Sequence, residues 1–132
     1  MNFLLDTDVI IDFQKKKNPG FTYFQTAVKK GASLSVISYS EIILGMQQFS
    51  NKQKLINEFE SMLEDFAVSV LPIDKQIGNK YAQLKYYLQN NKNLLPDFDI
   101  VIAASAISND LTLITRNIKH FSRIPNLQLF KQ

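Results

Sequence analysis

The amino-acid sequence predicts an α/β fold in which helices cover a mostly parallel sheet of four to five strands. Short apolar runs alternate along the chain with longer segments whose apolar residues recur at helical spacing. Each gap between successive runs is long enough to hold the right-handed crossover that parallel neighbours require. With 132 residues and no linker-like or low-complexity segment, the chain is expected to form a single domain over residues 1–132.

The predicted strands are short apolar segments bounded by polar residues, Gly or Pro. Pro72, for example, ends the third of them because it lacks a backbone donor. The strands are predicted over residues 3–6, 33–38, 68–71, 111–115 and 127–130.

The predicted helices are identified by apolar spacing and by their end signals. Gly31 is suited to end one helix, and Asp74 to cap another. Every fourth residue or so of segment 52–66 is apolar, which predicts a packing face. The helices are predicted over residues 7–15, 21–30, a segment starting at residue 40 or 41, 52–66, 75–88, 98–108 and a short turn after residue 117.

The composition excludes several kinds of site and location. The chain has no Cys and a single His, so disulfides are excluded and a zinc site is not expected. We find no signal-peptide pattern, and the apolar runs are shorter than the roughly 20 residues that span a bilayer. We therefore expect a soluble, cytoplasmic protein without a membrane association. Its net charge of +3 is compatible with a nucleic-acid substrate.

Four acidic residues stand where predicted strands are followed by helices. Asp6 ends the first strand, Glu41 follows the second, and Asp97 and Asp99 open an apolar helix. In a parallel sheet such residues converge at the carboxyl edge, the usual location of a site in an open α/β fold. Crowded carboxylates repel one another unless a cation neutralises them, and oxygen ligands suit Mg²⁺ or Mn²⁺. The pattern indicates a metal-dependent phosphoryl-transfer or nuclease site, with Asp6 and Asp99 as metal ligands and Asp97 as a cap or auxiliary acid.

Other polar residues near these positions receive more ordinary interpretations. The Thr7 hydroxyl could orient a carboxylate or a water molecule, whereas Asp8 and Asp12 are expected to be helix-start and surface acids. His120 is interpreted as a packing or loop residue in preference to a general base. The candidate site contains no Ser-His-Asp or Cys-His set and no glycine-rich phosphate loop, which argues against covalent catalysis and nucleoside triphosphate binding.

Four segments, in order and at compatible spacing, resemble the PIN-domain family, and most closely its VapC-type toxins. They are LLDTDVI (4–10), SYSE (38–41), PDFD (96–99) with IAA (102–104), and LITRNIKHF (113–121). The resemblance covers essentially the whole chain. It implies a three-layer α/β/α sandwich and Mg²⁺- or Mn²⁺-dependent endoribonuclease activity on structured RNA such as tRNA or rRNA. It further implies a homodimer and inhibition by a cognate antitoxin protein.

The resemblance also assigns roles residue by residue. Asp6, Glu41 and Asp99 match the family's acidic ligands, and Asp97 matches a position that is often acidic. The family's fourth acid falls at Asn117, which keeps an oxygen but lacks the charge. Candidates for substrate binding are Arg116, Lys119 and Thr7.

Two other functions remain open from the sequence. Asp6-Thr7-Asp8 also resembles the opening motif of haloacid-dehalogenase phosphatases, but Thr115-Arg116-Asn117 lacks the paired acids of that family. A degenerate PIN-like domain that binds RNA or a protein without cleaving is the second alternative. The presence of both Asp6 and Asp99 argues against it.

Overall fold

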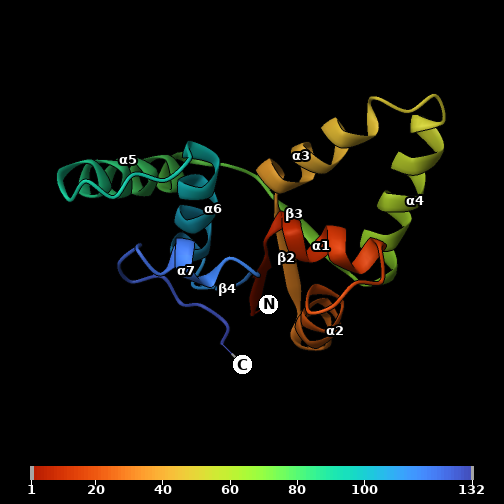
Figure 1. Ribbon diagram of the computed structural model, residues 1–132, viewed down its shortest axis with the longest axis horizontal. Coiled ribbons are helices and arrows are strands. Elements are labelled where there is room, and N and C mark those ends of the chain that lie inside the picture. Colours follow the sequence, from red (N-terminus) through yellow and green to blue (C-terminus); the bar gives the residue numbers. More distant parts are fainter. Residues whose placement is uncertain (1, 132) are drawn as a thin grey trace.

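A computed structural model describes residues 2–131 and contains a parallel four-stranded sheet (Figure 1). The strand order is β3-β2-β1-β4, with β1 paired to both β2 and β4. The strands are β1 (Phe3–Leu5), β2 (Ala32–Ser35), β3 (Ser69–Leu71) and β4 (Thr112–Ile114). The predicted fold class is confirmed.

Helices cover both faces of this sheet and produce three layers (Figure 1). Leu4 points into an apolar cluster formed with α5 and α6, whereas Phe3 and Leu5 point into a second cluster with α1, α2 and α4. This division follows from the alternation of side chains along a strand. The helices are α1 (Thr7–Gln14), α2 (Gly20–Lys30), α3 (Val36–Met46), α4 (Lys52–Asp65), α5 (Lys75–Asn90), α6 (Asp97–Ser108) and α7 (Ile118–Phe121). Over residues 2–131, none of them is long and apolar enough to cross a membrane.

Two predicted strands and the start of one predicted helix differ most from the structure. The second strand ends at Ser35 instead of residue 38, because the Ser35 hydroxyl accepts a hydrogen bond from Ile37 N–H (3.1 Å) and caps α3. The apolar, β-branched Val36 and Ile37 gave a strand pattern, but they form the first turn of that helix. The predicted last strand at 127–130 is reduced to a single parallel bridge between Leu113 and Leu129.

The register of the sheet determines which residues meet at its carboxyl edge. Leu5 at the end of β1 lies opposite Leu34 of β2 and Ile114 of β4. The residues that follow Leu5 and Ile114 are Asp6 and Thr115, which therefore lie next to each other. This neighbourhood is where the predicted acidic site should form.

Candidate functional site

Asp6 lies at the carboxyl edge of the sheet, between β1 and α1. Its carboxylate accepts hydrogen bonds from the Thr7 backbone N–H (2.9 Å) and from the Thr115 hydroxyl (2.7 Å). The residue is only 8% exposed. Asp6 is thus both the N-cap of α1 and a buried acid at the predicted site, so these two interpretations are compatible.

Thr115 is a site residue that the sequence analysis missed. It is buried, and its hydroxyl also accepts a hydrogen bond from the backbone N–H of Asn117 (3.0 Å). Thr115 therefore connects the Asp6 carboxylate to the turn before α7. Its position one residue after an apolar strand, like that of Asp6, was the available signal.

The surroundings of Asp6 disfavour its ionised form. Burial, followed by the charge of Asp8, raises its pKa from 3.8 to about 7, and the charge of Asp99 adds to this rise. Hydrogen bonds from Thr115 and Thr7 act in the opposite direction but do not cancel it. Asp6 therefore has a high affinity for a proton or for a cation that replaces it.

Asp99 lies in the first turn of α6 and contacts the only histidine of the chain. Its Oδ2 is 2.8 Å from Nε2 of His120 on α7, and the two side chains are 28% and 22% exposed. The interpretation of His120 as a packing or loop residue is incomplete: the residue lies on α7, and its imidazole also touches one of the predicted metal ligands.

A hydrogen bond from the first turn of α1 fixes the Glu41 side chain. Its Oε1 accepts a hydrogen bond from the Thr7 hydroxyl (2.8 Å), as expected for a threonine that orients a carboxylate. Because α3 starts at Val36, Glu41 lies in the second turn of a helix and not at its start, so that part of the prediction is wrong. The side chain is exposed at the edge of the acidic site.

Asp97 is directed to a neighbouring helix. Its Oδ1 accepts hydrogen bonds from Lys85 Nζ (2.6 Å) and from the Tyr81 hydroxyl (2.8 Å), both on α5. These bonds, chiefly that from Lys85, lower the pKa of Asp97. Pro96 occupies the N-cap position of α6, where no side-chain capping bond forms, so the expectation that Asp97 caps this helix is wrong.

Asp8 and Asp12 are not simple surface acids. The Asp8 carboxylate accepts a hydrogen bond from Arg116 N–H (3.3 Å), and burial raises its pKa. Asp12 is 2% exposed, accepts a hydrogen bond from Gly20 N–H (3.1 Å) and lies 3.1 Å from Arg116 Nε. A Cβ atom at Gly20 would come within 2.3 Å of Asp12, so only glycine permits this approach. Periodicity could not reveal this partnership because it depends on residues far apart in sequence.

We expect Arg116→Ala to lower the free energy of unfolding by about 2 kcal/mol, because it leaves the buried Asp12 charge without its partner. This is below the usual cost for a fully buried pair since the Arg116 side chain is 40% exposed. Urea denaturation of both proteins would measure the difference, with exposed Lys119→Ala as a control expected to stay within about 0.5 kcal/mol. Equal stability of the Arg116→Ala and Lys119→Ala proteins would contradict the prediction.

The remaining predicted residues lie on the segment after β4. Asn117 occupies the N-cap position of α7, and its side chain makes no capping hydrogen bond. Lys119 is exposed on α7. Within residues 2–131, neither side chain makes a hydrogen bond or ion pair with the acidic residues, whereas Arg116 and His120 do.

The carboxylate oxygens at this site suit Mg²⁺, which keeps part of its water shell, better than a metal ion enclosed entirely by side chains. Within residues 2–131, no group of three or more His, Cys, Asp or Glu side chains is arranged to hold a metal ion. Mg²⁺ usually takes one or two carboxylates and completes its shell with water and substrate phosphate oxygens. Asp6 and Asp99 can supply two such carboxylates, and the raised pKa of Asp6 is a physical reason for a cation to bind there.

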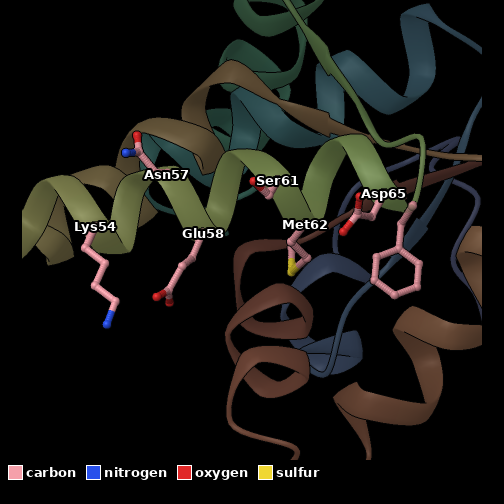
Figure 2. A pocket seen from close by; sticks show the side chains of 7 residues that line it. Lys54, Asn57, Glu58, Ser61, Met62 and Asp65 are labelled. Atoms are coloured by element: carbon pink, nitrogen blue, oxygen red, sulfur yellow. The ribbon is translucent and has the colours of Figure 1, made fainter.

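Neither Asp6 nor Asp99 lines either of two surface depressions. One, of about 710 Å³, lies along α4 and is lined by Lys54, Asn57, Glu58, Ser61, Met62, Asp65 and Phe66 (Figure 2). It contains none of the predicted site residues. The other, a groove of about 880 Å³ between α1, α3 and α4, reaches Glu41 and is named the α1/α3/α4 groove below. The predicted packing face of α4 is only partly covered, since Leu55 and Met62 line this groove.

The sequence and the fold both match known proteins. The PIN domain family model matches residues 3–127. The chain belongs to the PIN-domain family. This membership sets aside the haloacid-dehalogenase alternative.

Relatives of this PIN domain include ribonucleases of the VapC type. Ribonuclease VapC1 of Haemophilus influenzae (strain R2866) is 31% identical, over 97% of this chain and 96% of that protein. Ribonuclease VapC2 of Rickettsia felis is 30% identical, over 98% and 96%. The solved structure of VapBC-1 from nontypeable Haemophilus influenzae superposes with a TM-score of 0.85, at 30% identity, over 99% of this chain and 98% of that one. The chain is a VapC-type PIN-domain protein.

Proposed function

We propose that this protein is the toxin of a toxin–antitoxin pair and a metal-dependent endoribonuclease that hydrolyses phosphodiester bonds in RNA. The observation that carries the proposal is the buried Asp6, whose pKa is raised to about 7 beside the carboxylates of Asp8 and Asp99. Crowded acids of this kind suit a divalent cation. The names of the VapC relatives support ribonuclease activity for the same fold.

Asp6 and Asp99 would hold Mg²⁺ or Mn²⁺, which when bound supplies activation of water and neutralisation of charge on the phosphodiester. The chain's own residues keep these ligands in place. Thr115 and the Thr7 backbone fix the Asp6 carboxylate, and the Thr7 hydroxyl fixes Glu41 at the edge of the site.

The other predicted residues take supporting roles in the proposal. Asp97 is an auxiliary acid whose carboxylate already has two partners on α5. The Asn117 amide can orient water or ligand where the family often has a fourth acid. Arg116 and Lys119 would bind phosphate, although the Arg116 guanidinium also neutralises Asp12. Thr7 retains its proposed contact with substrate, because it lies between Asp6 and Glu41.

The substrate class, assembly and location follow from the family resemblance. We propose structured RNA such as tRNA or rRNA as substrate, a homodimer, a single PIN-like domain and a cytoplasmic location. The net charge of +3 supports an RNA substrate, because the positive excess attracts a polyanion. Because carboxylates repel phosphate, the acidic site would depend on its cation to accept the substrate.

An antitoxin is the proposed protein partner, and the α1/α3/α4 groove is its proposed docking surface. Solved relatives of this fold include a VapBC complex. The groove is lined by apolar side chains, among them Ile42, Met46 and Phe59, and Glu41 stands at its edge. An amphipathic helix can place its apolar face in such a groove. A basic side chain of the antitoxin would then reach the acidic site next to it.

Phe49→Asp should weaken antitoxin binding by at least about 10-fold, because it places a charge where an apolar contact is expected. Phe49 lines the groove and is 50% exposed, so little loss of stability is expected. Co-purification of the antitoxin with the tagged protein would measure the effect. Tyr86→Asp on α5, outside the groove and 68% exposed, is the matched control. Equal retention of the antitoxin by both variants would refute this docking surface.

Cleavage of total tRNA and rRNA by the purified, antitoxin-free protein tests the proposed activity. Cuts at discrete positions are expected with Mg²⁺ or Mn²⁺ and should disappear with EDTA. Equal cutting in EDTA would contradict a metal-dependent nuclease. A folded, metal-loaded protein that binds RNA without cutting any of these substrates would favour the inactive binding module.

A further inference from the structure

The contact between His120 and Asp99 joins two segments that the sequence separates by 21 residues. Nε2 of His120 lies 2.8 Å from Oδ2 of Asp99, and both side chains are mostly buried. The imidazole packs against Phe121, its neighbour in α7. The two rings are arranged edge-on, with their centroids 5.6 Å apart. Phe121 is itself buried in the core, so it anchors the short helix α7 that carries His120.

The direction of this hydrogen bond follows from the chemistry of the two groups. A carboxylate that ligates a metal must be deprotonated, so with Asp99 in that form Nε2 of His120 carries the hydrogen and donates it. The bond uses Oδ2 of Asp99. Within residues 2–131, Oδ1 of Asp99 accepts no side-chain hydrogen bond and is left for another ligand.

We propose that His120 is a positioning residue for the metal site, which holds Asp99 through Oδ2 and leaves Oδ1 to the cation. The inference rests on the proposed function, because it assumes that Asp99 is a metal ligand. Loss of a hydrogen bond to a ligating carboxylate typically weakens metal binding by about 10–100-fold. His120 is not itself a metal ligand in this proposal. It acts through Asp99 and not on the substrate.

Mn²⁺ binding to the metal-free protein, measured by isothermal titration without RNA, tests this role directly. His120→Leu removes the donor, whereas His120→Gln keeps an amide N–H near the position of Nε2. Should His120→Leu not fold, His120→Asn gives the same contrast, because its shorter amide overlaps Nδ1 instead. Arg123→Ala, at an exposed position just after α7, serves as the control, and Asp99→Asn as the reference for loss of a ligand.

His120→Leu is expected to weaken Mn²⁺ binding by about 10-fold or more, while His120→Gln and Arg123→Ala bind close to wild type. Binding by His120→Leu as tight as wild type or tighter would overturn the inference, the latter because His120 would then compete with the cation. Equal losses in the Leu and Gln variants would also overturn it, by showing a packing role. If Asp99→Asn binds Mn²⁺ like wild type, the proposed metal site itself fails. If only Asp99→Asn loses binding, the metal site stands and the role of His120 does not.

Discussion

Asp6→Asn and Asp99→Asn are each expected to lower the rate of RNA cleavage in saturating Mg²⁺ by at least about 100-fold, since a catalytic cation contributes several kcal/mol to the transition state. Each substitution replaces a charged oxygen ligand by a neutral amide of nearly the same shape. The loss should therefore come from metal binding and chemistry, and not from a changed fold. The initial rate of cleavage of tRNA or rRNA at matched protein concentration is the measurement.

Asp65→Asn is the matched control for both variants, because it makes the same chemical change at an exposed position at the end of α4. It should cleave at the wild-type rate. Circular dichroism of all three variants would establish that they are folded. Cleavage that persists in the Asp6 and Asp99 variants would mean a contaminating nuclease or a site elsewhere on the molecule.

Asp6→Asn should also make the metal-free protein more stable at pH 8, although it disables the site. The folded-state pKa of Asp6 is raised from 3.8 to about 7, so between these values the folded state binds more protons than the unfolded state. The stability of the wild type therefore falls as pH rises from about 4 to about 7 and stays low above that range. A shift of this size corresponds to at most about 4 kcal/mol, and imperfect hydrogen bonding by the amide offsets part of it, so a gain of roughly 1–3 kcal/mol is expected.

Urea denaturation in EDTA at pH 5 and pH 8 would measure this gain. Asp6→Asn should exceed the wild type by more at pH 8 than at pH 5, whereas Asp65→Asn should differ from it by the same small amount at both. Added Mn²⁺ should raise the stability of the wild type and reduce the difference, because a ligand that binds only the folded state stabilises it. A stability difference between Asp6→Asn and the wild type that does not change with pH would show that Asp6 is not the titrating group.

The sequence predicted the elements well wherever local chemistry decides them. The helix predicted from residue 75, the capping by Asp74 and the helix end at Gly31 all appear as expected, since each depends on a few neighbouring residues. Gly31 adopts φ 98°, a conformation that favours glycine. The prediction was wrong at residues 36–38, where the apolar, β-branched Val36 and Ile37 fit a strand pattern but form the start of α3. There the serine cap decided the outcome.

By itself, the sequence determined the fold class, the family and the candidate acids Asp6, Glu41, Asp97 and Asp99, because periodicity, strand ends and ordered motifs are local properties. Only the tertiary structure decided which partner each acid has. It paired Asp99 with His120, Asp6 with Thr115, Asp97 with Lys85 and Asp12 with Arg116. Such contacts depend on how the elements pack across the sheet, and burial at that edge sets the pKa of Asp6. Ion pairs and hydrogen bonds between distant segments leave no pattern along the sequence, so the sequence alone could not predict them.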